Sequence, residues 1–254
     1  MKRGIYASVG KLLPWLIPCS LLLLWQLVSM IGIISEKTLP APTDIMEAAF
    51  RLLLNGELYT HMSISLWRAI IGFLIGASIG FIFGLLNGVF RYSDLLFDTS
   101  IQMLRNIPHL ALIPLVILWF GIGETSKIFL VALGVLFPVY INTYHGIKSV
   151  DKRLIEMGKS YGLKGNQLFF HVILPGALSS ILVGIRFSLG VMWLTLIVAE
   201  TISAQSGIGY MAMNAREFMQ MDVIVLSILI YALFGKISDV IARFFEGKWL
   251  KWDT

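Results

Sequence analysis

Long apolar stretches separated by short polar segments run through most of the chain. A helix needs about 20 mostly apolar residues to cross the hydrocarbon core of a membrane. Six stretches meet this need approximately and are flanked by charged residues, at residues 12–34, 69–90, 107–121, 127–146, 178–203 and 222–242. We therefore predict an all-α membrane protein in which residues 1–254 form a single domain, a six-helix transmembrane bundle.

Prolines distinguish two of these spans. The span at 107–121 is short and carries Pro108 and Pro114, and Pro138 interrupts the next one. Backbone groups freed by a break inside a membrane are tolerated only where neighbouring helices or a water-filled cavity satisfy them. We expect both helices to lie inside the bundle.

The second span carries a glycine at every fourth position. Helix backbones approach closely where small residues line one face, so this ladder predicts a contact with another helix. Two of its glycines also complete a G-x-S-x-G pattern around Ser78, but a hydrolase nucleophile needs a strand-turn-helix elbow and a base. We therefore interpret the ladder as a packing surface and predict no catalytic residue; its members are Gly72, Gly76, Gly80, Gly84 and Gly88.

Composition agrees with a membrane protein. Hydrophobic residues make up 57% of the chain and charged residues 14%, whereas about 25% of a typical soluble domain is charged. This excludes a soluble enzyme. The single cysteine, Cys19, cannot form an intrachain disulfide or a cysteine-based zinc site, and no metal site is predicted.

The basic residues indicate an orientation. Lys2, Arg3 and Lys11 precede the first span, which is too long for a cleaved secretion signal and lacks a small-residue cleavage site. With the N-terminus in the cytoplasm, thirteen basic residues lie in inside segments and five outside: Lys37, Arg51, Arg68, Lys127 and Arg216. Cytoplasmic loops are enriched in lysine and arginine, so we predict cytoplasmic termini. The net charge of +5 then requires no nucleic acid partner.

Two polar segments carry helix signals. In the outer segment at 35–68, Asp44 and Glu47 have the spacing of an N-cap and its partner, and Asn55-Gly56 predicts the stop of a short surface helix. The largest inside loop, 147–177, predicts a helix from Asp151 to Tyr161, a C-cap glycine at Gly162, and a second short helix ended by Pro175. An exposed helix-turn-helix with aromatic residues suggests a docking site for another protein.

This loop resembles the EAA loop of ATP-binding cassette importer permeases. Glu156 takes the acidic position, Gly162 the glycine, Val172 the isoleucine and Leu174-Pro175 the closing pair, with both spacings kept. Met157 and Gly158 stand where the family has two alanines. Further segments, among them LPAPTDIMEAAFRLLLNGEL and GIRFSLGVMWLTLIVAE, are similar to the nitrate/sulfonate/taurine branch of that superfamily.

The resemblance implies a permease subunit of the bacterial inner membrane that forms a homodimer in the lipid bilayer. It would carry a small, anionic solute such as a sulfonate, taurine or nitrate. Cytoplasmic ATPase subunits would receive the loop from Glu156 to Pro175, and an external solute-binding protein would deliver the substrate. The chain itself would be non-catalytic and hold no cofactor, because ATP would bind to the partner subunits.

Charged residues inside the spans leave an alternative open, an ATP-independent secondary carrier or channel. Arg186 and Glu200 lie on one face of the fifth span, but their 14-residue separation places them about 21 Å apart, too far to pair. Intramembrane charges usually face a bundle interior or a cavity, so either residue could line a pathway or serve the structure. Lys236 and Asp239, three residues apart, are expected to satisfy one another.

Overall fold

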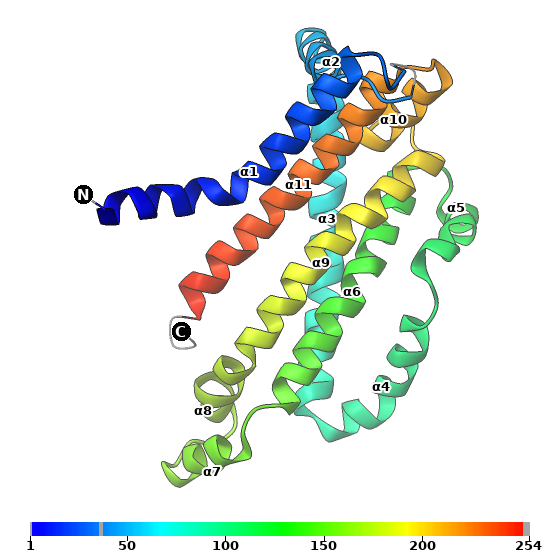
Figure 1. Cartoon of the computed structure of the whole chain (residues 1–254). Coiled ribbons are helices and arrows are strands. Elements are labelled where there is room, and N and C mark those ends of the chain that lie inside the picture. The colour runs from blue at the N-terminus through cyan, green and yellow to red at the C-terminus, as the bar shows by residue number, and fades with distance from the viewer. Residues whose placement is uncertain (1, 36–37, 251–254) are drawn as a thin grey trace.

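The structure is a computed structural model that describes residues 2–35 and 38–250, and within residues 2–15 the side chain of Leu13. Over these residues it is almost entirely helical and contains no strand, which confirms the predicted fold class. The elements, shown in Figure 1, are α1 (Lys2–Met30), α2 (Pro42–Leu54), α3 (Glu57–Val89), α4 (Arg91–Arg105), the 3₁₀ helix η1 (His109–Leu112), α5 (Ile113–Phe120), α6 (Glu124–Lys148), α7 (Lys152–Ser160), α8 (Asn166–Leu168), the π-helical turn η2 (Phe169–Ile173), α9 (Leu174–Ser203), α10 (Ile208–Glu217) and α11 (Met221–Trp249).

Helix α6 forms the centre of the bundle. It packs between α3 and α9, while α10 and α11 cover α9 (Figure 1). Its side chains Val131, Val135 and Val139 are buried and belong to the main hydrophobic cluster together with Leu196 of α9 and Ile208 of α10. The short helices α7 and α8 project from one end of the bundle, and α2 and α10 lie at the opposite end.

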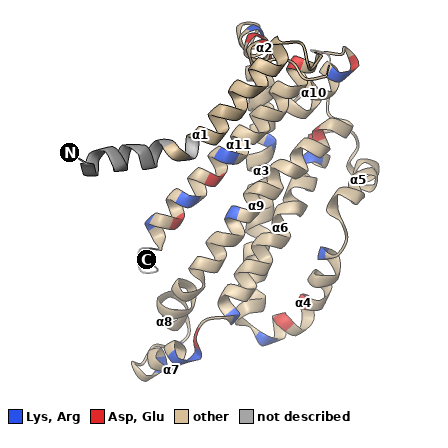
Figure 2. Cartoon of the chain, viewed as in Figure 1, with Lys and Arg blue, Asp and Glu red and all other residues tan. Residues whose placement is uncertain are grey.

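Among the residues that the structure describes, four helical segments are long and apolar enough to cross a membrane: 57–89, 124–148, 166–203 and 221–249. A fifth is possible if the bent pair of α4 with η1 and α5 forms one span. The described apolar part of α1, Leu16–Met30, is shorter than a span. The predicted number of six spans is therefore not confirmed. Charged residues gather near the two ends of the bundle and on the lower half of α11 (Figure 2).

The span predicted at 107–121 is not one long helix in the structure. Residues 109–120 form η1 and α5 only, bounded by Pro108 and by Gly121 with its φ of +76°. The polar helix α4 precedes them and is bent by 80° relative to them. The sequence interpretation missed α4 because its apolar residues are interrupted by charges.

Two further boundaries differ from the predicted ones. Pro138 lies within a continuous α6 rather than interrupting it; the helix is buried between α3 and α9, where neighbours satisfy the freed backbone. Helix α3 begins at Glu57, twelve residues before the predicted start of its span, because its polar first turns continue directly into the apolar part. Arg68 is therefore helical rather than part of an outer loop.

The short helix α2 confirms the prediction for residues after Pro40, including the stop at Asn55 and Gly56, whose φ is +75°. Its predicted cap is wrong by three residues. The helix begins with Pro42, and the Asp44 carboxylate accepts a hydrogen bond from the Ala41 backbone N–H at 3.0 Å. A proline favours the first turn because its missing N–H has no partner to lose there.

All five glycines of the ladder face α6. A Cβ atom built on Gly76 or Gly80 would fall on the carbonyl oxygen of Ala132 or Leu136. A Cβ on Gly72 would lie 2.6 Å from Val131, one on Gly84 would lie 2.7 Å from Thr143, and one on Gly88 would lie 2.9 Å from Ile147. The two backbones therefore approach as closely as glycine alone permits.

Candidate functional site

The loop at 147–177 forms a compact hairpin of helices at one end of the bundle. Asp151 caps α7 by accepting a hydrogen bond from the Arg153 N–H at 2.8 Å. At the other end of α7, the Leu163 N–H donates to the Gly158 carbonyl at 3.0 Å and the Gly162 N–H donates to the Lys159 carbonyl at 2.9 Å. These are the two bonds of a Schellman motif. Gly162 takes its left-handed position, with a φ of +85°.

The second half of the hairpin differs from the predicted short helix. A second glycine in the turn, Gly165, has a φ of +50° and starts α8. The chain then runs through η2 directly into α9, so that residues 166–203 form one continuous helical segment. Pro175 does not end a helix but lies in the first turn of α9, just after the π-helical turn.

Gly158, which replaces an alanine of the EAA pattern, is buried where α7 meets η2. A Cβ on this residue would lie 2.9 Å from Leu168 Cδ1 and 3.1 Å from Val172 Cγ2. The departure from the pattern therefore coincides with a very close contact between the two arms of the hairpin.

The hairpin presents apolar side chains to its surroundings. Leu154, Met157, Tyr161 and Phe170 are all more than two-fifths exposed. A cavity of about 470 Å³ opens between the arms and the start of α9; it is lined by Leu154, Met157, His171, Val172, Pro175, Gly176 and Ser179. Glu156 lies on the exposed side of α7, and Leu174 and Pro175 are half-buried beneath the arms. This surface can accept an apolar partner.

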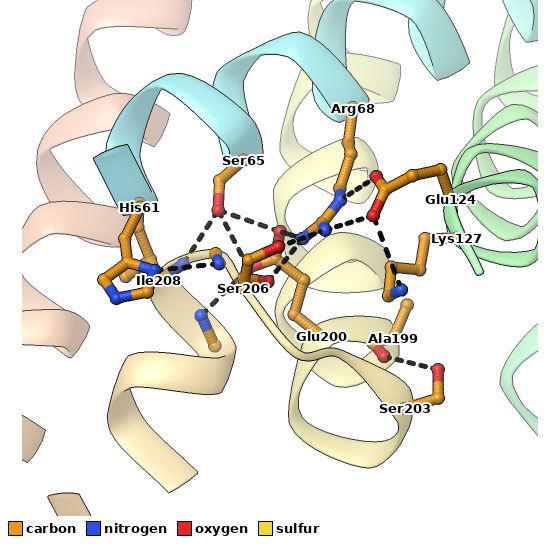
Figure 3. A network of polar contacts seen from close by, with 12 residues as sticks. His61, Ser65, Arg68, Glu124, Lys127, Ala199, Glu200, Ser203, Ser206 and Ile208 are labelled. Carbon is orange, nitrogen blue, oxygen red and sulfur yellow. Dashed lines mark hydrogen bonds and ion pairs between the residues drawn. The ribbon is translucent and has the colours of Figure 1, made fainter. Parts of the chain in front are cut away.

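A cluster of buried charges lies at the opposite end, and Arg68 of α3 is its centre (Figure 3). The Arg68 side chain has no solvent exposure. Its guanidinium donates to both carboxylate oxygens of Glu124, at 2.5 and 2.6 Å, and to Glu200 at 2.7 Å. It also donates to the carbonyl and hydroxyl oxygens of Ser206, at 2.6 and 2.9 Å. All five N–H groups of the arginine therefore have partners.

Glu200 of α9 is the buried counterion. Besides Arg68, its carboxylate accepts hydrogen bonds from the Ser65 hydroxyl, the Tyr231 hydroxyl and the Gly209 N–H, at 2.8, 2.8 and 2.9 Å. The residue is 1% exposed. One carboxylate thus joins α3, α9, α10 and α11, and this arrangement fits a structural role better than contact with a substrate.

The first turn of α6 completes the cluster. Glu124 is the accessible carboxylate, with 57% of its side chain exposed, whereas the Lys127 side chain is 3% exposed. The Lys127 ammonium donates to the Gly123 carbonyl at 3.0 Å and lies 3.9 Å from Glu124. The positive charges of Arg68 and Lys127 are therefore balanced by the negative charges of Glu124 and Glu200.

The sequence interpretation assigned Arg68 and Lys127 to outside segments and did not predict this cluster. One signal was present for Arg68, because it lies four residues before Gly72 and so continues the face of the glycine ladder toward α6. Its partner Glu200 is 132 residues away.

Arg186, which was also predicted inside a span, does not reach Glu200, as expected, and pairs with α11. Its guanidinium lies 2.7 Å from Asp239 and 3.4 Å from Glu246. The predicted pair of Lys236 with Asp239 is present at 3.9 Å, but Arg243 approaches Asp239 more closely, at 3.0 Å. Arg186 and Asp239 line a groove of about 490 Å³ between α9 and α11 whose other walls are apolar.

Comparisons with known proteins place these features in a family context. Residues 59–251 match the model of the family described as binding-protein-dependent transport system inner membrane component. The permease protein SsuC of Escherichia coli K12, named for aliphatic sulfonates transport, is 61% identical over 96% of this chain and 92% of its own. The taurine transport system permease protein TauC of the same strain is 33% identical over 99% of this chain and 91% of its own. A solved structure of an amino acid ABC transporter superposes with a TM-score of 0.63 at 19% identity, over 80% of this chain and 96% of that one.

Proposed function

The chain belongs to the family of binding-protein-dependent transport system inner membrane components, the permeases of ATP-binding cassette importers, and we propose that its substrates are small sulfonates, with taurine among them. The observation that carries the substrate class is the 61% identity to SsuC over 96% of the chain. An ATP-independent carrier or channel has no need of the exposed hairpin, so the family and the hairpin both oppose that alternative.

Uptake into vesicles tests this function. The permease, reconstituted with its ATPase subunits and its solute-binding protein, should accumulate ethanesulfonate and taurine when ATP is supplied inside. Accumulation that persists without ATP would favour a secondary carrier, and uptake of nitrate in place of both sulfonates would overturn the substrate class. Heat stabilisation of the binding protein by each compound gives an independent measure of the substrate.

The partner arrangement is part of the proposal. The hairpin from Glu156 to Pro175 docks on cytoplasmic ATPase subunits, which bind the ATP, and this chain contributes no cofactor and no catalytic residue. Support comes from the exposed apolar side chains of α7 and from the cavity between the hairpin arms. With the hairpin in the cytoplasm, both termini are cytoplasmic as well, and two copies of the chain form a homodimer in the bilayer around the pathway.

Replacing Gly162 by valine should abolish transport without preventing membrane insertion. The cause is conformational, since a Cβ at Gly162 meets nothing within 4 Å but the residue has a φ of +85°, which a β-branched residue strongly disfavours. The hairpin would therefore lose its shape while the bundle stays intact. Uptake and membrane-fraction abundance are the two measurements. Gly162→Asn is the matched control, because asparagine tolerates this conformation; normal uptake by the valine variant would reject the role of the turn.

Arg186 is proposed to be the cation that an anionic substrate meets in the pathway. Its side chain remains 37% exposed in spite of two carboxylate neighbours, and an exposed charge inside a membrane usually faces protein or water rather than lipid. Arg186→Gln should lower sulfonate uptake about tenfold, the loss of roughly 1.4 kcal/mol. The control is Arg243→Gln, which removes a second, 59% exposed partner of Asp239. Equal uptake by both variants would reject the pathway role.

A further inference from the structure

A ladder of polar side chains joins α4 to α6 at the end of the bundle that carries the hairpin. On α6, Tyr140, Tyr144 and Lys148 follow one another at four-residue intervals and therefore share one face. The two tyrosine rings are stacked with their centroids 5.9 Å apart, and the Lys148 ammonium lies 5.6 Å from the centre of the Tyr144 ring.

The facing side of α4 has a matching pair of carboxylates, Asp94 and Asp98, also four residues apart. The Tyr140 hydroxyl donates to Asp98 at 2.8 Å, and the Lys148 ammonium donates to Asp94 at 2.9 Å. The Tyr144 hydroxyl interacts with Asp94 as well. The partners run in opposite order on the two helices, as antiparallel neighbours require.

Helix α3 closes this arrangement from a third side. The Asn87 amide donates to the Tyr140 hydroxyl at 2.8 Å, and the Ser93 hydroxyl donates to the Asn87 amide oxygen at 2.6 Å. Asn87 and Tyr140 both have no solvent exposure. Leaving a buried polar group without its hydrogen-bond partner destabilises a protein. The bonds from Ser93 through Asn87 and Tyr140 to Asp98 therefore hold the start of α4 in one place.

Apolar burial contributes little to the position of α4. None of its side chains is buried, and Leu95 and Leu96 are about 70% exposed. Its aromatic contact is the edge of Phe97 on Phe83 of α3, with ring centroids 5.8 Å apart. The polar ladder is therefore the element that ties α4 to α6.

The ladder lies between the hairpin and the bent pair. Lys148 is the last residue of α6, and α7 starts four residues later, at Lys152. Between them, Val150 is buried and lies 3.2 Å from where a Cβ of Gly176 would be, so the connection is fixed to α9 as well. In the other direction, α4 leads directly into the 80° bend before η1 and α5.

We propose that the ladder of Asp94 and Asp98 with Tyr140, Tyr144 and Lys148 transmits movement of the hairpin to α4 and so opens and closes the bent α4–α5 pair. These are positioning residues, and the proposal rests on the proposed function as an ATP-driven permease. The Tyr140–Asp98 bond, whose tyrosine is buried and whose carboxylate is partly buried, supplies stiffness. The Lys148–Asp94 pair, with side chains 42% and 22% exposed, contributes less because water screens it.

The ratio of sulfonate transported to ATP hydrolysed in the reconstituted transporter tests the proposal. Tyr140→Phe should keep ATP hydrolysis but lower this ratio about tenfold. Tyr92→Phe, which removes a hydroxyl from the 81% exposed Tyr92 of α4, is the matched control and should leave the ratio unchanged. Asp94→Lys and Lys148→Asp should each lower the ratio, and the double variant should recover it. An unchanged ratio in Tyr140→Phe, or no recovery in the double variant, would overturn the proposal.

A second measurement is independent of transport. In a Cys19→Ser background, spin labels at Leu95 of α4 and Tyr161 of the hairpin, 70% and 82% exposed, report the distance between the two elements in the full-length permease. Labelled subunits are diluted with unlabelled ones so that distances stay within one chain. A narrow distribution in the parent and a broad one in Tyr140→Phe are expected. If the two distance distributions are equally wide, the role of the polar ladder is overturned even if the importer itself proves inactive. If the importer is inactive but the distribution is broader in Tyr140→Phe, the result counts against the proposed function alone.

Discussion

Replacing Glu200 by alanine is expected to lower the free energy of unfolding by about 3–5 kcal/mol, the usual cost of removing one partner of a buried ion pair. The substitution leaves four donors without their acceptor in a site closed to water, from Arg68, Ser65, Tyr231 and Gly209. Native proteins are stable by only about 5–15 kcal/mol, so little folded protein should survive purification. Thermal unfolding in detergent and gel filtration measure the effect.

Two variants serve as controls for this prediction. Asp222→Ala removes the partner of Arg51 in a pair whose side chains are 26% and 55% exposed at 3.2 Å, and should change stability by less than about 1 kcal/mol. Glu200→Gln keeps the shape and part of the hydrogen bonding and should fall between the two. If Glu200→Ala unfolds at the same temperature as Asp222→Ala, the cluster does not stabilise the bundle.

The second large effect is expected from Gly76→Ala, although it adds a single methyl group. That methyl would overlap the carbonyl oxygen of Ala132 and lie 2.9 Å from its Cα atom. Backbone atoms in the middle of a packed helix cannot move aside as a flexible side chain can. The α3–α6 contact must open, at a cost of about 3 kcal/mol, the upper end of the range for overpacking.

The chain offers a matched substitution for comparison. Gly235 lies within α11, and a Cβ there meets nothing within 4 Å. Gly235→Ala should therefore be neutral or stabilise the protein by about 0.5–1 kcal/mol, because alanine favours the helix over the unfolded chain. Unfolding of both variants in the same detergent distinguishes packing from helix propensity. Similar stabilities for Gly76→Ala and Gly235→Ala would contradict close packing of α3 on α6.

The two ends of the bundle have different chemistry. At the end opposite the hairpin, the Arg68 cluster joins α3, α6, α9, α10 and α11, and its charges are mostly sealed from water. At the hairpin end, the contacts between α4 and α6 consist of hydroxyls and partly exposed charges. Local opening is easier where few apolar groups are buried. Movement of α4 is therefore expected to cost less than separation of the helices around Glu200.

Local patterns in the sequence determined the helical class, the glycine face of α3, the short helix α2 and the turn at Gly162. Each depends on residues within one or two helical turns, such as the four-residue spacing from Gly72 to Gly88. The resemblance to the EAA loop assigned Glu156, Val172, Leu174 and Pro175 to one helical hairpin. It did not reveal that Pro175 continues a helix, because proline is compatible with both a stop and a first turn.

Only the tertiary structure decided which charges meet. Arg68 and Glu200 are separated by 132 residues and Asp98 and Tyr140 by 42, and no periodicity connects them. Helical spacing determines which side chains share a face, but the neighbour of that face depends on how distant helices pack. The bend between α4 and α5 was hidden for the same reason. Ser65 and Arg68, which the sequence places in an outer polar segment, are tolerated inside the bundle because Glu200 of α9 satisfies them.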